Sequence, residues 1–169
     1  MPPELRSARL VLRPIEPPDR TALHRLWTDP DVRRYLWDDL VIDLATVDEV
    51  IGRSAASFAA EGFGLFALRE PDGAELLGVT GIYRLQPGGE PELIYSLARA
   101  CWGRGLASEA SRAVISDAFE RLGFARVLAR TDPPNLASLE VMRRLGMQYV
   151  GEHEEDGRPT VSYTIARSG

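Results

Sequence analysis

The first third of the chain shows one strand pattern followed by a helical one. Residues 9–13 (RLVLR) alternate apolar and charged side chains, which is typical of a strand with one buried face, and Pro14 limits its continuation. A short helix is predicted between Asp19, a candidate cap, and Asp29–Pro30, a stop. Its apolar residues recur at helical spacing: Leu23, Leu26 and Trp27.

A longer helix is predicted next, ending at Gly62. Thr46, followed three residues later by Glu49, has the form of a capping box. Apolar side chains then recur on one helical face: Val47, Val50, Ile51, Ala55 and Phe58. We therefore expect an amphipathic helix that starts near Thr46.

Hydrophobic runs in the middle of the chain predict three strands. Residues 63–69 and 75–85 are rich in β-forming side chains, and residues 71–73 (PDG) between them suit a tight turn. These two runs should pair antiparallel. Residues 92–97 predict a further strand after the loop over residues 86–91.

The last part of the chain alternates helices and strands. A long helix is predicted over about residues 104–122, with Gly123 as its C-terminal cap. A short strand over residues 126–130 and a helix over residues 135–145 follow. Two final strands flank the turn at Asp156–Gly157.

Together these elements predict one α/β (α+β) domain over residues 1–169. The compact strand–helix–strand unit over residues 92–130 favours a right-handed parallel crossover, whereas the hairpins on either side are antiparallel. The expected architecture is a mixed, mostly antiparallel central sheet with one parallel crossover pair and helices on both faces. No internal repeat or low-complexity linker points to a second domain.

Composition narrows the functional classes. The chain is 44% hydrophobic and 27% charged, as is ordinary for a globular protein. No apolar run reaches the roughly 18 residues that span a bilayer, and residues 1–10 lack a signal-peptide core, so we expect a cytoplasmic protein without a membrane partner. A net charge of -5 argues against direct nucleic acid binding. Cys101 is the only cysteine, and no metal site is expected from two unsupported histidines, His24 and His153.

The segment before the long helix has the chemistry of an anion-binding loop. Gly103 and Gly105 permit positive φ, so that several backbone N–H groups can converge on a phosphate at the positive end of the helix. A plain glycine-containing turn is the alternative. Walker and dinucleotide-binding loops are excluded, because the Gly-Lys-Ser/Thr ending and the third glycine are both missing.

Three segments together resemble the GNAT superfamily of N-acetyltransferases, and within it the RimJ/RimL-like branch. Residues 102–107 (WGRGLA) resemble the coenzyme A pyrophosphate loop, Arg/Gln-x-x-Gly-x-Gly/Ala, although Trp102 replaces the usual Arg or Gln. Residues 9–14 resemble the opening strand of that branch, and residues 132–147 resemble its Asn-x-x-Ser…Leu-Gly-Phe segment. The resemblance covers most of the chain and implies the acyl-CoA N-acyltransferase fold.

The resemblance also implies acetyl-CoA as cosubstrate, attacked directly by an amine without a covalent enzyme intermediate and without a metal. It implies that strand backbone at residues 97–99 holds the acetyl carbonyl, and that the pantetheine arm lies where two parallel strands splay. The residues implied to contact the cosubstrate are Leu97, Ala98, Arg99, Trp102, Gly103, Arg104, Gly105, Leu106, Ala107, Ser108, Asn135 and Ser138.

Acetyl transfer requires a neutral amine and a proton for the departing thiolate. Glu92 matches the Glu of the branch's Glu-Ile-Gly-Tyr strand and is implied as the base, directly or through water; a solvent-facing Glu is the alternative. Met142 occupies the position of the Tyr that many members use as the acid. Ser138 is therefore the candidate acid, in competition with a bound water, and Asn135 suits both a helix cap and a pantetheine contact.

The acceptor is expected to be a primary amine, either the N-terminal α-amine of a protein or peptide or a small-molecule amine. The resemblance assigns its recognition to residues 23–60 and 150–160, whose acidic residues either favour a cationic amine or are simply solvated. The alternative from another class is a domain that binds acyl-CoA without turnover, as a sensor or regulator. A homodimer is compatible with either reading.

Overall fold

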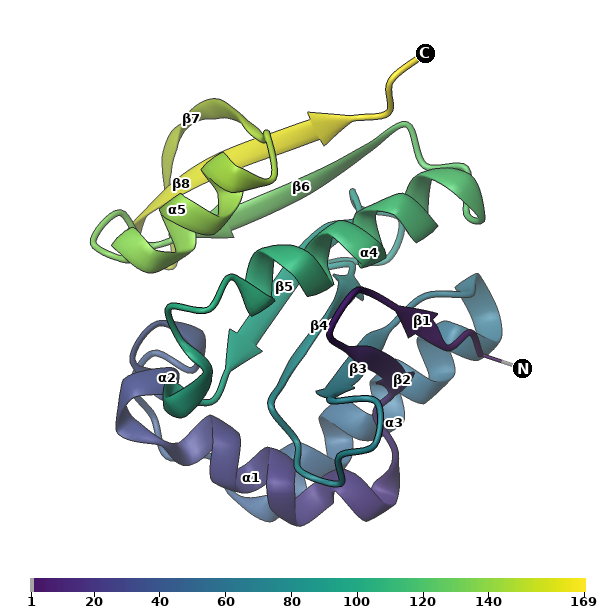
Figure 1. Cartoon of the computed structure of the whole chain (residues 1–169). Coiled ribbons are helices and arrows are strands. Elements are labelled where there is room, and N and C mark those ends of the chain that lie inside the picture. Colours follow the sequence, from purple (N-terminus) through teal and green to yellow (C-terminus); the bar gives the residue numbers. More distant parts are fainter. Residues whose placement is uncertain (1) are drawn as a thin grey trace.

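An eight-stranded sheet lies at the centre of the computed structural model, which describes residues 2–169 (Figure 1). The strands lie in the order β1-β2-β3-β4-β5-β6-β8-β7. Their bounds are β1 (Leu5–Arg6), β2 (Val11–Pro14), β3 (Leu65–Arg69), β4 (Gly78–Tyr83), β5 (Glu92–Leu97), β6 (Arg126–Thr131), β7 (Gln148–Glu155) and β8 (Arg158–Ala166). Only β5 and β6 run parallel among these neighbours, which confirms the predicted mixed sheet.

Helices cover both faces of the sheet, as predicted (Figure 1). Three lie on one face: α1 (Arg20–Thr28), α2 (Pro30–Leu36) and α3 (Leu44–Glu61). Two lie on the other: α4 (Leu106–Glu120) and α5 (Leu136–Arg144). Short 3-10 turns over Pro17–Asp19 and Arg99–Cys101 precede α1 and α4. No helix within residues 2–169 combines the length and the hydropathy needed to cross a membrane.

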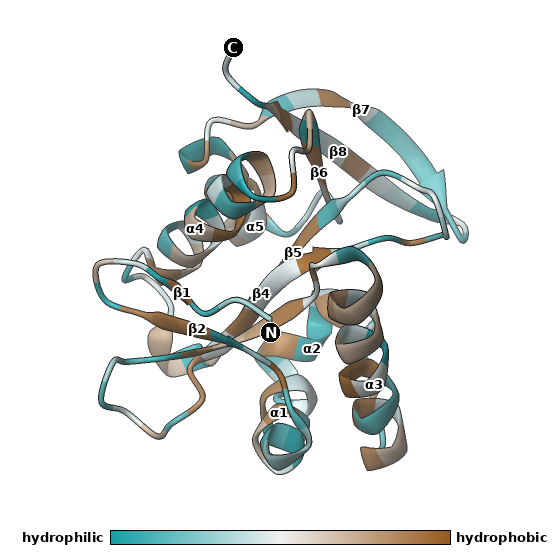
Figure 2. Ribbon diagram, turned by 90° about the vertical axis from the view of Figure 1, so that its right-hand side faces the viewer, coloured by the Kyte–Doolittle hydropathy of each residue, from teal (hydrophilic) through white to brown (hydrophobic). Residues whose placement is uncertain are grey.

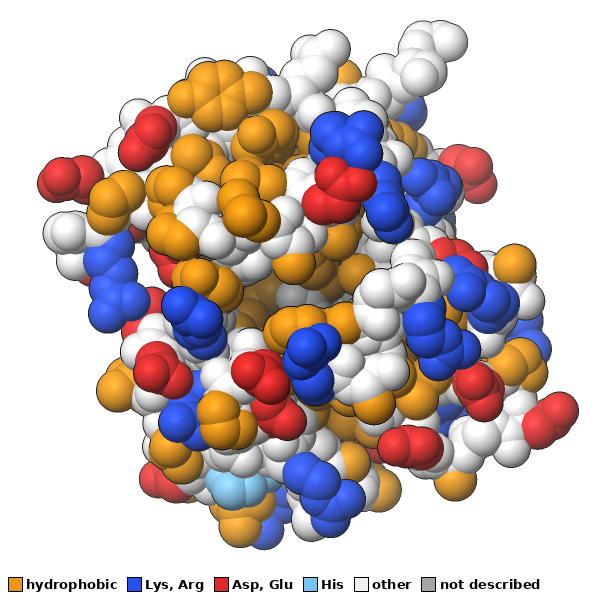
Figure 3. All heavy atoms as spheres, turned by 60° about the vertical axis from the view of Figure 1, so that its left-hand side comes forward, with side chains coloured by type: hydrophobic (Ala, Val, Ile, Leu, Met, Phe, Trp, Pro, Cys, Tyr) orange, Lys and Arg blue, Asp and Glu red, His pale blue; other side chains and the backbone are white. Residues whose placement is uncertain are grey.

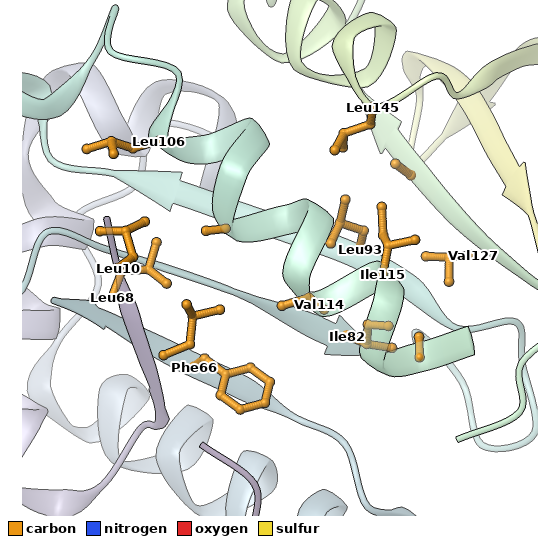
Figure 4. Close-up of a cluster of buried hydrophobic side chains, with 14 of the residues drawn as sticks. Leu10, Phe66, Leu68, Ile82, Leu93, Leu106, Val114, Ile115, Val127 and Leu145 are labelled. Atoms are coloured by element: carbon orange, nitrogen blue, oxygen red, sulfur yellow. The ribbon is translucent and has the colours of Figure 1, made fainter. Parts of the chain in front are cut away.

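Two hydrophobic clusters, one on each face, hold these layers together. Leu93 of β5 packs with Val114 and Ile115 of α4 (Figure 4), whereas Ile94 packs against the cluster beneath α1–α3. Because consecutive strand residues face opposite sides, odd-numbered β5 residues point toward α4 and α5 and even-numbered ones toward α1–α3. At the sheet edge, β7 is largely hydrophilic (Figure 2), which fits an exposed edge strand.

The starts of two helices differ from the sequence prediction. Asp29–Pro30 does end α1, but the same residues begin α2, which was not predicted: the Asp29 carboxylate accepts a hydrogen bond from the Asp31 N–H at 2.9 Å, and Pro30 is the first helical residue. The capping-box prediction was wrong, because α3 begins at Leu44 with Asp43 as its cap. The Asp43 carboxylate accepts from the Thr46 N–H at 2.8 Å.

The predicted inward face of α3 was also wrong at one position. Ala55 is exposed, whereas Ser54 is buried, with its hydroxyl accepting a hydrogen bond of 2.8 Å from the Leu65 N–H. A buried serine is tolerated here because it satisfies a backbone donor at the start of β3. The pairing of β3 with β4 is antiparallel, as predicted, although β4 begins at Gly78 rather than at Glu75.

Candidate active site

The parallel strands β5 and β6 separate soon after they meet. Their only register pair within residues 2–169 is Glu92 with Leu128, where the Leu128 N–H donates to the Pro91 carbonyl at 3.0 Å. Beyond this pair lies a cavity of about 460 Å³, which we call the β5–β6 cleft. Figure 3 shows a hollow rimmed by arginine and carboxylate side chains on this side of the molecule.

Most of the predicted site residues line this cleft. They are Glu92, Leu97, Trp102, Gly103, Gly105, Leu106, Ala107, Ser108, Asn135 and Ser138. Ala98, Arg99 and Arg104 lie next to it in sequence but do not line it. The structure therefore brings together β5, the loop before α4, and the first turns of α4 and α5.

The loop before α4 has the backbone conformation expected of an anion cradle. Gly103 and Gly105 have φ of 78° and 74°, in the left-handed region that glycine enters without strain. Gly105 caps α4 without any side-chain hydrogen bond, and the first turn of bonding starts with the Glu109 N–H to the Gly105 carbonyl at 3.1 Å. The N–H groups of residues 106–108 therefore have no intrahelical partner and suit an anion.

Two arginines that the sequence analysis missed flank this cradle. A Cβ placed on Gly105 would lie 3.8 Å from Nη2 of Arg9 and 4.0 Å from Nη1 of Arg144. Arg9 also donates to the Arg104 carbonyl at 2.9 Å. These residues are about a hundred and about forty positions from the loop, so no local pattern indicated them. Their positive charges favour a phosphate group at this point.

Glu109, in the first turn of α4, is held away from the cradle. Its carboxylate accepts from the Ser7 hydroxyl at 2.5 Å, from the Arg9 N–H at 2.9 Å and from Arg9 Nε at 2.8 Å. Burial alone would raise the pKa of Glu109, but the hydrogen bonds from Ser7 and Arg9 outweigh it and lower that pKa. The ion pair thus keeps Arg9 beside the loop.

Trp102 and Arg99 shape the loop through their side chains. Trp102 Nε1 donates to the Leu97 carbonyl at 2.9 Å, and the Arg99 guanidinium lies 4.6 Å from the centre of the Trp102 ring. Arg99 Nε also lies 3.6 Å from an oxygen of Asp31 in α2. Trp102 therefore fastens the loop to the end of β5, a role that the Arg or Gln usual at this position would not fill in the same way.

One implied contact of the acetyl group needs correction. The Ala98 N–H donates to the Leu77 carbonyl at 2.9 Å and is not free to bind a carbonyl oxygen. Because backbone groups alternate in direction along an antiparallel ladder, the N–H groups of Leu97 and Tyr95 point instead toward the gap between β5 and β6. These two amides, rather than that of Ala98, are open to the cleft.

Glu92 is buried, with 5% of its surface exposed, so the alternative of a solvent-facing Glu is wrong. Both of its carboxylate oxygens accept from Arg130: Nε to Oε1 at 2.9 Å and Nη2 to Oε2 at 2.6 Å. Arg130 also contacts Glu155 of β7. The hydrogen bond with Glu92 is the main cause of a raised Arg130 pKa. Opposite Glu92 in the sheet, burial and the Glu92 charge raise the pKa of Tyr83 to about 12.

A hydroxyl pair that the sequence analysis missed lies on the other side of β5. Tyr95 Oη is 2.6 Å from Ser138 Oγ and donates to the Ser138 carbonyl at 3.1 Å. Burial raises the pKa of Tyr95 to about 12, against a smaller opposing effect of Ser138. Tyr95 alternates with the buried Leu93 and Leu97, and a tyrosine hydroxyl on a buried face needs a partner, which is the signal that could have revealed it.

The helix that carries Ser138 is fixed by its own cap. Asn135 Oδ1 accepts from the Ser138 N–H at 3.2 Å, as its predicted capping role requires. Met142 is 1% exposed and lies in the hydrophobic core, one turn further along α5. The position that many similar proteins fill with Tyr therefore faces apolar surroundings here.

A second cavity, of about 490 Å³, lies between α3 and the sheet, and we call it the α3 cavity. It shares four lining residues with the β5–β6 cleft: Leu36, Tyr83, Ile94 and Ser96. Ile94 and Ser96 are even-numbered residues of β5 and face α1–α3. The two cavities therefore meet at β5, one approached from each side of the sheet.

The acidic residues near α2 and α3 serve local structure. Asp29 and Asp43 cap helices, Asp38 pairs with Arg158 at 2.7 Å, and Asp39 pairs with Arg33 at 3.1 Å. This arrangement supports the solvated, structural interpretation of these residues rather than recognition of a cationic acceptor. Arg158 belongs to β8, so its pair with Asp38 joins the last hairpin to the loop after α2.

Two further observations concern the single cysteine and metal-binding side chains. Cys101 lines the cleft but is 5% exposed, and burial raises the pKa of its thiol, which disfavours the thiolate. Within residues 2–169, no group of three or more His, Cys, Asp and Glu side chains is arranged to hold a metal ion.

Comparisons with a family model, a curated protein and a solved structure all match this chain to acetyltransferases. The family model described as acetyltransferase (GNAT) domain matches residues 9–148. The uncharacterized N-acetyltransferase p20 of Bacillus licheniformis is 30% identical over 149 residues, which cover 87% of this chain and 83% of p20. A solved acetyltransferase of Agrobacterium tumefaciens is 27% identical, with a TM-score of 0.85 and coverage of 98% of this chain and 95% of that one.

A more distant structure shares the fold alone. RimL, a ribosomal L7/L12 alpha-N-protein acetyltransferase solved with coenzyme A, is 18% identical. It superposes with a TM-score of 0.82 over 97% of this chain and 98% of RimL.

Proposed function

Because this chain belongs to the GNAT family of acetyltransferases, we propose that it transfers the acetyl group of acetyl-CoA directly to a primary amine. As a member of this family it is an acyltransferase. The observation that carries the proposal is that the anion cradle before α4 opens into the same cleft as the buried Tyr95–Ser138 pair. This arrangement supports a phosphate site and a proton donor along one path.

The residues of the cleft fit the parts of acetyl-CoA in order. The N–H groups of residues 106–108, with Arg9 and Arg144 beside them, would hold the pyrophosphate. The pantetheine arm would follow the separated edge of β5, where the Tyr95 and Leu97 N–H groups point into the gap. One of these amides would also bind the acetyl oxygen, whose negative charge grows as the amine attacks.

Attack forms a bond from the amine nitrogen to the acetyl carbon, and collapse of the intermediate breaks the bond from that carbon to sulfur. The nitrogen must lose one proton and the sulfur can gain one. Glu92 is the proposed proton acceptor, directly or through water. Its two-point contact with Arg130 holds the carboxylate in place beside the cleft. A weak base is sufficient for an α-amine with a pKa near 8, which is about a tenth neutral at pH 7.

The proposed acid is the Tyr95–Ser138 pair. Ser138 lines the cleft and would donate its hydroxyl proton to the thiolate. Tyr95, 2.6 Å away, would rotate its hydroxyl from the Ser138 carbonyl toward Oγ, give its proton to Ser138, and regain one from solvent before the next turnover. A Tyr95 pKa of about 12 keeps this hydroxyl protonated at neutral pH, so that its proton is present at the start of each turnover. The pair thus takes the place of the single Tyr that Met142 replaces.

The resemblance to the RimJ/RimL-like branch supports a protein N-terminal α-amine as one acceptor class. The likeness to RimL is a likeness of fold at 18% identity, so it does not choose between that class and a small-molecule amine. The acceptor would reach β5 from the side of α1–α3, where the α3 cavity meets the cleft.

The test is release of coenzyme A thiol from acetyl-CoA, followed with a thiol reagent in the presence of a panel of primary amines. We expect release that depends on both enzyme and amine, with the acetylated amine identified by mass spectrometry. Tight coenzyme A binding without amine-dependent release from any panel member would favour the acyl-CoA sensor instead.

A further inference from the structure

The α3 cavity has the surroundings of a small-molecule site. Its walls include the indole rings of Trp27 and Trp37, packed edge to face with centres 5.7 Å apart, and the aliphatic side chains of Val50, Val79 and Ile94. A volume of about 490 Å³ with largely apolar walls and few polar groups is typical of pockets that enclose small ligands. A peptide bound by strand addition would instead need a groove of open backbone donors and acceptors.

Both indoles of this cavity carry a hydrogen-bond donor. The indole Nε1 of Trp37 is buried and has no hydrogen-bond partner within residues 2–169, which is uncommon for a buried donor. The neighbouring indole is satisfied, since Trp27 Nε1 donates to the Ser96 hydroxyl at 3.2 Å. Because Trp37 Nε1 has almost no exposed surface, Trp37 lines the cavity with its ring and not with this donor.

The charges that line the cavity do not balance. Arg84 is matched by Glu61 at 2.9 Å and lies over the Phe63 ring at 5.3 Å. Arg53 of α3 lines the same cavity and takes part in no ion pair within residues 2–169. The positive charge of Arg53, whose side chain is exposed, thus remains for a ligand. A guanidinium binds a carboxylate more strongly than it binds a neutral carbonyl.

We infer that the acceptor is a small primary amine with an aromatic or branched apolar body that also carries a carboxylate. Its body would fill the α3 cavity beside the Trp27 and Trp37 rings, its carboxylate would accept from Arg53, and its amine would reach the cleft near Tyr83 and Ser96, which line both cavities. This inference rests on the proposed acetyl transfer, because it names the molecule that receives the acetyl group.

The first experiment measures binding, which does not depend on turnover. Calorimetry in the presence of coenzyme A would compare two pairs of amines that differ by a carboxylate: phenylalanine with phenethylamine, and 4-(aminomethyl)benzoate with benzylamine. We expect the carboxylate member of at least one pair to bind about tenfold more tightly. Equal affinity within both pairs would overturn the inference.

Matched variants connect that preference to the cavity. Arg53→Ala should remove the preference while leaving the affinity for the carboxylate-free amine within about twofold, whereas Trp37→Phe, which keeps an aromatic ring, should leave the preference unchanged. Arg25→Ala on α1 removes an exposed arginine outside both cavities and should change neither affinity. A carboxylate preference that survives Arg53→Ala would show that the carboxylate binds elsewhere and would contradict the inference.

Turnover then separates this inference from the proposed function. Amine-dependent thiol release that is faster with the carboxylate amines supports both. Release that is fastest with phenethylamine, or with an amidated tripeptide bearing an N-terminal phenylalanine, keeps the acetyltransferase activity and rejects the acceptor class. Carboxylate-dependent binding without any release supports the ligand class of the cavity and rejects acetyl transfer.

Discussion

The carboxylate of Glu92 and the guanidinium of Arg130 form a two-point ion pair across the parallel strands β5 and β6, at the point where these strands begin to separate. Their two contacts measure 2.9 and 2.6 Å, and only 6% of the Glu92 side-chain surface and 14% of the Arg130 side-chain surface are exposed. Both residues line the β5–β6 cleft, and Tyr83, which lies opposite Glu92 in the sheet, lines both cavities, so the pair lies beside their junction. A substitution at either residue of this pair should therefore affect both the stability of the sheet and the reactivity of Glu92, the proposed base.

Arg130→Met should destabilise the fold, because it leaves the Glu92 charge buried without a partner. Breaking a buried pair in this way costs about 3 to 5 kcal/mol. Urea denaturation would measure the change in the free energy of unfolding. Arg126→Met is the control, since its ion pair with Glu90 is exposed and should contribute less than about 1 kcal/mol. A loss for Arg130→Met no larger than that of the control would contradict a buried charge pair.

Glu92→Gln should slow acetyl transfer at neutral pH and make the rate rise more steeply with pH. The glutamine cannot accept a proton, so only the fraction of amine that is already neutral reacts. Steady-state rates from pH 6.5 to 9.5 would show this. Glu155→Gln is the matched control, because Glu155 also contacts Arg130 but does not line either cavity. Identical pH profiles for Glu92→Gln and the wild type would remove Glu92 as the base.

Gly105→Val should weaken coenzyme A binding by at least tenfold. A valine at φ of 74° is strained, and its Cβ would stand between Arg9 and Arg144, where the phosphate is expected. Gly88→Val is the control: Gly88 has φ of 75° and open space around it, but it lies in the loop before β5 and outside both cavities. Calorimetric titration with coenzyme A would compare them. Similar coenzyme A affinities for the two variants would exclude the loop before α4 as the phosphate-binding site.

Tyr95→Phe and Ser138→Ala should each lower kcat with little effect on coenzyme A affinity. Each change interrupts the path of the proton to the thiolate, and general acid catalysis contributes about a hundredfold or more. The double variant should be no slower than the slower single variant, because both residues act in one relay. Wild-type rates for Ser138→Ala would indicate that water supplies the proton.

Alkaline pH should destabilise the protein through Tyr83 and Tyr95. Both have a pKa of about 12 in the folded protein, above the ordinary value of about 10. Their contribution is therefore fully present below pH 10 and is lost as pH rises through 12, by about 3 kcal/mol for each residue. Unfolding free energies between pH 9 and 12 should fall less steeply in Tyr95→Phe. Tyr149→Phe, at a side chain with 60% exposure, should leave the slope unchanged.

The hydrophobic pattern and the glycine positions were sufficient for most of the architecture. The strand over residues 92–97, the anion loop at Gly103 and Gly105, and the helix cap at Asn135 depend on local periodicity or local backbone conformation, which neighbouring residues determine. The same local reasoning failed at the start of α3, where Asp43, and not Thr46, is the N-cap residue. Two good capping residues so close together offer no sequence signal for choosing between them.

The partners of the reactive groups were decided only by the tertiary structure. Glu92 and Arg130 are 38 residues apart, Tyr95 and Ser138 are 43, and Arg9 reaches a loop about a hundred residues away. Such contacts depend on which strand lies beside which and on where β5 and β6 separate. The sequence by itself therefore determined the elements and the anion loop. Packing across the sheet determined which carboxylate is paired, which hydroxyls meet, and where the two cavities join.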